Sequence, residues 1–134
     1  MKDKSTVCKA FNKHFFDFIE DLLVIFPNSK EIMFAKSSFS TVNRFNVSLL
    51  IKQWYNNVYL PYGEQIANND IEFFLQKDYS TDLKKNKDAK QSDEIIKMIE
   101  NIRQPIATTD EINKQHSLKY LQNLNKLSAA YNSI

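Results

Sequence analysis

The segment FNKHFFDFIEDLLVIFP, residues 11–27, decides the fold class of this chain. Its large apolar side chains recur at steps of three and four residues, which is the spacing of one face of an α-helix. They are Phe11, Phe15, Phe18, Leu22 and Ile25, and the neighbouring Phe16, Ile19 and Leu23 widen the face. The pattern predicts a helix over residues 5–26 that is buried on more than one side. It should end before Pro27, because proline disfavours helical backbone at the residue preceding it.

The next two helices are predicted from their capping residues. Asn28 or Ser29 can cap free amide groups at the start of a second helix, which is expected to end somewhere within residues 37–46. A third helix is expected to begin near Asn46 or Ser48. Downstream of it, Pro61 and the single glycine of the chain, Gly63, predict a break or a kink.

The C-terminal half predicts three more helical segments. Asp70 can cap a short helix, and Ser92 begins a helix that is expected to close at Pro105. The buried edge of that helix is expected to consist of Ile95, Ile96, Ile99 and Ile102. Residues 108–111 match the S/T-x-x-E capping box and predict the start of the last helix. Its expected buried face consists of Ile112, His116, Tyr120, Leu124, Leu127 and Tyr131.

Length and composition fit one domain over residues 1–134, since domains are most often about 100–150 residues long. The single glycine argues against β-architectures and excludes a glycine-rich phosphate-binding loop. No apolar run reaches the roughly 20 residues that a membrane span needs. We therefore predict an all-α fold, a compact orthogonal bundle of five to six helices, with a charged and mobile loop at residues 77–91.

Neither a metal site nor a catalytic site is predicted. The only cysteine, Cys8, and the two histidines, His14 and His116, lack the spacing of metal ligands or of a nucleophile held against a base. Asp17, Glu20 and Asp21 lie opposite the Phe-rich face of the first helix and are interpreted as solvated. We expect a protein that is not an enzyme and has no cofactor.

A tyrosine group offers the first candidate binding surface. At helical spacing Trp54 and Val58 face the core, whereas Tyr55, Tyr59 and Tyr62 share an adjacent face. Tyrosine suits protein interfaces because a large apolar ring carries a polar tip. The pattern fits a protein interface, and it also fits tyrosines at the boundary of the core.

A lysine cluster offers the second candidate surface. Lys84, Lys85, Lys87 and Lys90, together with Arg44, could bind nucleic-acid phosphates in a salt-sensitive way. Acidic residues dilute the cluster, and the net charge of the chain is only +2. Dedicated nucleic-acid binders usually carry a larger basic excess and more arginine. Nucleic acid is therefore the less favoured partner.

Several short motifs resemble those of a family of uncharacterised small helical proteins encoded by nucleocytoplasmic large DNA viruses of algae and protists. The motifs are FIEDL at residues 18–22, FP at 26–27, LI at 50–51, PYGEQI at 61–66 and DIEFFLQKDYS at 70–80. The resemblance implies a viral structural or interaction protein, such as a minor capsid protein or another virion component. It implies that the chain binds other viral proteins or itself, in the virion or the host-cell cytoplasm. The alternative is a nucleic-acid-associated or transcription-related viral factor.

Overall fold

The structure is a computed structural model that describes residues 3–76 and 90–134. Every regular element in these residues is helical. In chain order they are α1 (Lys4–Ile25), α2 (Lys30–Phe45), α3 (Leu49–Trp54), the π-helix η1 (Tyr55–Tyr59), α4 (Leu60–Ala67), α5 (Ile71–Gln76), α7 (Lys90–Ala107) and α8 (Glu111–Ser133). Because α3, η1 and α4 are contiguous, the described residues form six helical segments. The predicted all-α bundle of five to six helices is confirmed.

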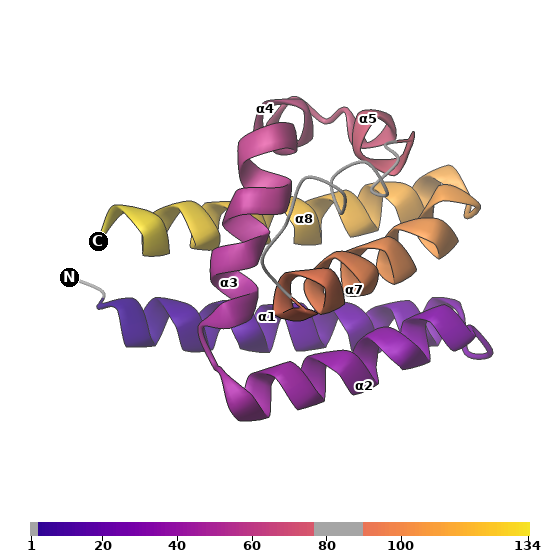
Figure 1. Cartoon of the computed structure of the whole chain (residues 1–134). Helices are drawn as coiled ribbons and strands as arrows, with labels where there is room; N and C mark the ends of the chain where they lie inside the picture. Colours follow the sequence, from indigo (N-terminus) through magenta and orange to yellow (C-terminus); the bar gives the residue numbers. More distant parts are fainter. Residues whose placement is uncertain (1–2, 77–89) are drawn as a thin grey trace.

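The bundle is built from two helix pairs and a crossing segment (Figure 1). α1 packs mainly against α8, and α2 packs mainly against α7. The segment formed by α3, η1 and α4 runs across these helices and contacts both α1 and α8 (Figure 1). Within the described part of the chain, no helix combines the length and apolar character that crossing a membrane requires.

The first helix matches its prediction closely. Asp3 caps α1, where its carboxylate accepts from the Thr6 amide at 2.8 Å. The rings of Phe11 and Phe15 are fully buried and lie edge-on to the Trp54 ring, with centroids 6.0 and 5.8 Å apart. Aromatic pairs in this geometry add to the stabilisation that burial provides. The Phe-rich face of α1 therefore forms the centre of the core.

The boundaries of α7 differ from the prediction at both ends. The helix begins at Lys90 rather than at Ser92, inside the segment predicted as the loop 77–91, and residues 77–89 of that segment lie outside the described residues. At the other end it continues through the buried Pro105 to Ala107. Pro105 lacks the amide hydrogen that a regular helix uses at this position, and its own carbonyl oxygen accepts from the Thr108 hydroxyl at 2.9 Å.

The predicted capping box at the start of α8 is wrong. Asp110 is the N-cap, and its carboxylate accepts from the Asn113 amide at 2.8 Å. Thr108, the expected cap, is engaged with the end of α7. Thr108 thus provides a hydrogen-bond donor to the end of α7, and Asp110 provides an acceptor to the start of α8.

The predicted buried face of α8 is also wrong at its N-terminal end. Ile112 is 82% exposed, and His116 is exposed as well. The fully buried residues of α8 are instead Ser117, Leu118, Leu121, Leu124, Asn125 and Ser128. Half of these residues are polar, so the spacing of apolar residues in the sequence did not identify this face as buried.

Candidate functional site

The crossing segment has an unusual burial pattern. Apart from Ile51, its buried residues recur at a constant spacing of four, at Leu50, Trp54, Val58, Tyr62 and Ile66. In an ideal α-helix a spacing of four drifts by about 40° at each step, or about 160° over the run. The π-helix η1 holds more residues per turn and reduces this drift, so the face stays turned toward the core.

The expected break at Pro61 and Gly63 is absent, since both residues lie within α4. Pro61 occupies the first turn of α4, directly after the wide turn of η1. Proline lacks the amide hydrogen that continues helical bonding, and wide turns and prolines are common causes of local distortion. The backbone therefore stays helical through Pro61 and Gly63, and it forms a wider turn at η1.

The three predicted interface tyrosines separate into two environments. Tyr55 and Tyr59 are partly exposed and stacked, with ring centroids 5.0 Å apart. Tyr62 is only 1% exposed and packs edge-on to the rings of Phe73 and Phe74. The prediction that Tyr62 shares the surface of the other two is wrong, because η1 turns its position into the core.

A cleft of about 390 Å³ lies beside these tyrosines, between the crossing segment and α8. It is lined by Tyr59, Gly63, Ile66, Ala67, Gln122, Asn125, Lys126 and Ala129. Gln122 fastens one end, where its amide donates to the Ile66 carbonyl oxygen at 2.9 Å and to Asn69 Oδ1 at 3.0 Å. These two hydrogen bonds tie α8 to the C-terminal end of α4 beside the cleft.

Asn125 is the distinctive polar group of this cleft. It is 5% exposed, and its Oδ1 accepts from the Trp54 indole at 2.7 Å. Its amide nitrogen Nδ2 is buried and has no hydrogen-bond partner among the described residues. A buried donor without a partner is costly, so this amide group lowers the stability that the Trp54–Asn125 hydrogen bond provides.

A second polar cluster joins α1 to α8. The Tyr120 hydroxyl donates to Asp21, and His116 Nε2 lies 3.3 Å from the same carboxylate. The His14 ring lies against Tyr120, with centroids 4.8 Å apart. Asp21 is therefore a bridge between helices and not simply solvated, contrary to the sequence interpretation. Asp17 is solvent-exposed as predicted, and its carboxylate pairs with Lys13 of the same helix at 3.2 Å.

The electrostatics of this cluster follow from burial. Burial, and then the hydrogen bond to Asp21, raise the pKa of Tyr120 to about 12. Burial also lowers the pKa of His14, against the opposing effect of Asp17. Through these contacts the cluster joins α1 to α8. In the sequence, the only sign of this cluster was that His116 and Tyr120 are four residues apart and so lie on one side of a helix. Asp21, which contacts both, lies 95 residues from His116 and 99 residues from Tyr120.

We expect Tyr120 to make the fold sensitive to alkaline pH. The unfolded tyrosine loses its proton near pH 10, and the folded one near pH 12. Between these values the unfolded state binds fewer protons than the folded state, so the free energy of unfolding should fall as the pH rises from about 10 to about 12. Urea unfolding followed by circular dichroism at several pH values measures this slope. The Tyr120→Phe variant should show a shallower slope, and equal slopes would contradict the prediction.

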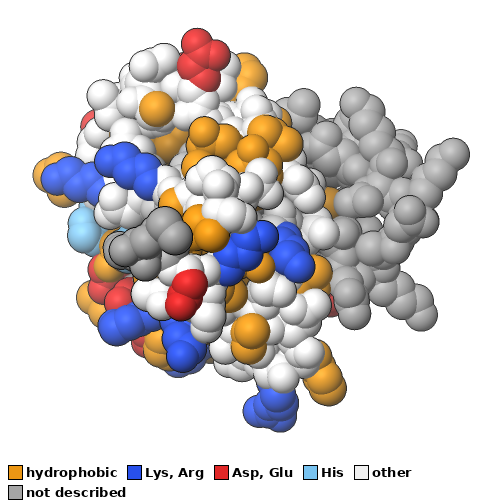
Figure 2. All heavy atoms as spheres, turned by 90° about the vertical axis from the view of Figure 1, so that its left-hand side faces the viewer, with side chains coloured by type: hydrophobic (Ala, Val, Ile, Leu, Met, Phe, Trp, Pro, Cys, Tyr) orange, Lys and Arg blue, Asp and Glu red, His pale blue; other side chains and the backbone are white. Residues whose placement is uncertain are grey.

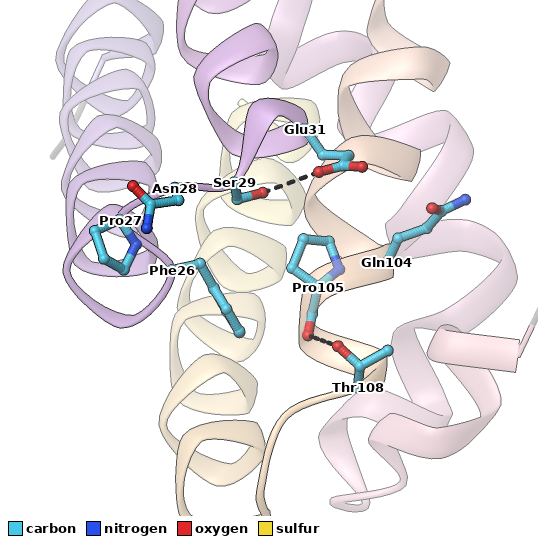
Figure 3. A pocket seen from close by; sticks show the side chains of 8 residues that line it. All are labelled: Phe26, Pro27, Asn28, Ser29, Glu31, Gln104, Pro105 and Thr108. Atoms are coloured by element: carbon cyan, nitrogen blue, oxygen red, sulfur yellow. Dashed lines mark hydrogen bonds between the residues drawn. The ribbon is translucent and has the colours of Figure 1, made fainter.

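A second pocket lies where the turn between α1 and α2 meets the end of α7 (Figure 3). The side chains of Phe26 and Pro105 line it, and its volume is about 460 Å³. Its hydroxyl groups are already used, because Ser29 donates to Glu31 at 3.1 Å and Thr108 donates to the Pro105 carbonyl oxygen at 2.9 Å (Figure 3). This pocket therefore offers less for polar recognition than the Asn125 cleft.

Most of the predicted nucleic-acid residues lie outside the part of the chain that the structure describes. Lys84, Lys85 and Lys87 lie outside it, and Lys90 begins α7. Arg44 is exposed in the last turn of α2. That binding surface stays a prediction.

Cys8 and the histidines form no metal centre. No group of three or more His, Cys, Asp or Glu residues suited to a metal ion occurs within residues 3–76 and 90–134. Burial raises the pKa of the Cys8 thiol, and its Sγ donates to the Val47 carbonyl oxygen at 3.0 Å. Cys8 is thus engaged in joining α1 to the start of the crossing segment.

Comparison with known proteins found no match to this chain among family models, curated proteins or solved structures. The geometry of the cleft and of the tyrosine pair is therefore the basis for a functional proposal.

Proposed function

We propose that this chain is a non-enzymatic interaction protein that binds another protein through the exposed side chains of Tyr55, Tyr59 and Leu60, here called the tyrosine surface. The observation that carries the proposal is the stacked tyrosine pair beside Leu60, which is 60% exposed. Tyrosine is enriched where protein interfaces carry most of their binding energy. Because the two rings are already stacked on each other, they lose little further conformational freedom when a partner binds.

The setting that we propose is viral. It rests on the resemblance of the 18–22, 61–66 and 70–80 motifs to proteins of large DNA viruses. We propose that the partner is another virion protein and that the chain is a minor capsid protein or other particle component. On the face that carries α3, exposed hydrophobic side chains lie among Lys and Arg side chains, a composition that supports association with a partner (Figure 2).

The first test asks whether the chain enters the particle. Quantitative proteomics should find it enriched in purified virus particles relative to infected-cell lysate. Absence from the particles, together with a monomeric state in solution, would overturn the proposed role.

The second test asks which surface binds. Replacing Tyr55 and Leu60 with Ser should weaken capture of the virion partner at least tenfold, or about 1.4 kcal/mol, because central aromatic and apolar anchors dominate binding energy. Phe34→Ser is the matched control, since Phe34 is 51% exposed on α2, away from this surface. An equal loss of partner binding in the Tyr55/Leu60 variant and in Phe34→Ser would indicate nonspecific hydrophobic association. It would contradict the assignment of binding to the tyrosine surface.

A further inference from the structure

A further pocket, of about 400 Å³, lies at the end of the bundle where both ends of the chain are found (Figure 1). Its lining comes from the first turns of α1, from the C-terminal end of α2 with the connection that follows, and from the end of α8. We propose that this pocket binds a phosphate monoester group. None of the residues of the tyrosine surface lines it, so the site does not depend on the protein-binding role proposed above.

Hydrogen bonds between distant segments hold the walls of this pocket in place. The Val47 carbonyl oxygen accepts from Asn12 Nδ2 at 2.8 Å and from the Cys8 thiol at 3.0 Å. Asn12 Nδ2 also donates to Asn43 Oδ1 at 3.0 Å. These bonds join α1 to the end of α2 and to the connection after it. The pocket is therefore formed before any ligand binds, as most small-molecule sites are.

The charges around the pocket are positive. Lys4 and Lys9 line it, and none of the described residues that line it is acidic. Lys4 Nζ lies 5.2 Å from the centre of the Tyr131 ring, which also lines the pocket, so this ammonium group is located at the pocket. Burial raises the pKa of the Cys8 thiol, and the positive charge of Lys52 opposes that shift, which places a third ammonium group nearby.

Lys4 and Lys9 form no ion pair within the described part of the chain. The acidic residue nearest to them in the sequence, Asp3, does not line the pocket. Its hydrogen bonds from Thr6, more than the charge of Lys9, lower the pKa of Asp3, so this carboxylate serves as the cap of α1. A group with nearly two negative charges suits several ammonium groups better than a carboxylate with one, and phosphate is such a group.

Asn43 adds an uncharged donor to the lining. The Val47 carbonyl oxygen can only accept, so the Asn12 atom that contacts it is the amide nitrogen. The Asn43 atom bonded to that nitrogen is then its oxygen, and Asn43 Nδ2 has no partner among the described residues. Asn43 is half-buried, and its Nδ2 retains contact with solvent, unlike the buried Asn125 amide. It is therefore accessible to a phosphate oxygen.

The apolar part of the lining favours an organic phosphate over inorganic phosphate. Val47 is 60% exposed, and the Tyr131 ring is partly exposed. A small apolar body attached to the phosphate would remove part of this surface from water. The pocket volume of about 400 Å³ lies within the range of small-molecule sites.

The test is an NMR titration of the full chain with phenyl phosphate, compared with benzoate, which carries one charge, and with neutral benzyl alcohol. At about pH 7.5 a phosphate monoester carries nearly two charges, and phenyl phosphate should bind saturably with a dissociation constant on the order of 1 mM. Amide shifts should concentrate at residues 4–12, 43–48 and 131. Benzoate should bind about threefold more weakly or less, and benzyl alcohol more weakly still. At about pH 5, where the phosphate loses one charge, the difference from benzoate should shrink.

Lysine variants locate the charge. Lys4→Gln and Lys9→Gln should each weaken phenyl phosphate about two- to fivefold, as expected for single exposed charges. Lys30→Gln is the matched control, because Lys30 is an exposed lysine at the opposite end of α2, outside the pocket. It should have no effect.

Two further variants place a negative charge in the lining. Val47 contributes its carbonyl oxygen to the hydrogen bonds and its side chain is largely exposed, so both Val47→Glu and Val47→Gln should fold. Val47→Glu should abolish measurable binding, whereas Val47→Gln, of nearly the same size, should retain most of it. Asn43→Asp keeps the acceptor for Asn12 but replaces the donor with a charged acceptor, and should also abolish binding.

A short phosphoserine peptide distinguishes the two sources of the phosphate. Tighter binding of this peptide than of phenyl phosphate would assign the group to a phosphorylated protein, and equal or weaker binding would assign it to a small molecule. Shifts that do not saturate, benzoate that binds as tightly as phenyl phosphate, or binding unchanged by Lys4→Gln, Lys9→Gln and Val47→Glu would each overturn the phosphate site. Partner capture that survives Val47→Glu leaves the tyrosine surface intact in every case.

Discussion

Trp54→Ala should lower the free energy of unfolding by about 3–5 kcal/mol, the typical cost of removing a large buried aromatic side chain. Trp54 is 1% exposed, and its ring lies edge-on to Phe11 and Phe15 at the centre of the core. The loss combines apolar area returned to water, a cavity that the rigid helices cannot close, and a missing donor for Asn125. Because natural domains are stable by only about 5–15 kcal/mol, this is a large fraction of the total.

Urea unfolding followed by circular dichroism measures this effect, since the variant lacks the only tryptophan that fluorescence would report. Val24→Ala is the control. Val24 is 81% exposed on α1, so its truncation should change the free energy of unfolding by no more than about 0.5 kcal/mol. A loss below about 1 kcal/mol for Trp54→Ala would mean that the ring does not hold the core together.

Trp54 also shows what the sequence was able to predict. Local patterns of large apolar residues identified α1, the core position of Trp54 and the isoleucine edge of α7, because each burial signal is strong and repeats within one helix. The sequence did not predict η1, since a spacing analysis assumes 3.6 residues per turn throughout. That assumption placed Tyr62 on the surface.

The cleft and the α1–α8 cluster escaped prediction for another reason. Trp54 and Asn125 are 71 residues apart, and Asp21 and Tyr120 are 99 residues apart. Polar residues carry no periodic burial signal, so Asn125 looked like one more surface side chain of the last helix. Contacts between distant polar groups depend on how the helices pack, and local spacing does not encode that packing.

The second large effect concerns which face of α8 is buried. Leu121→Ala should lower the free energy of unfolding by about 2–5 kcal/mol, because Leu121 is fully buried and its truncation leaves a cavity. Ile112→Ala should change it by about 0.5 kcal/mol or less, since Ile112 is 82% exposed. The sequence pattern alone assigned Ile112 to the core and omitted Leu121.

Thermal or urea unfolding of the two variants therefore discriminates between two orientations of the same helix. Both substitutions shorten an aliphatic side chain within α8 and leave helix propensity nearly unchanged or improved, so their difference reports burial. A larger loss for Ile112→Ala than for Leu121→Ala would mean that α8 is rotated about its axis. Asn125 would then turn away from Trp54, and the buried hydrogen bond between these two side chains would be lost.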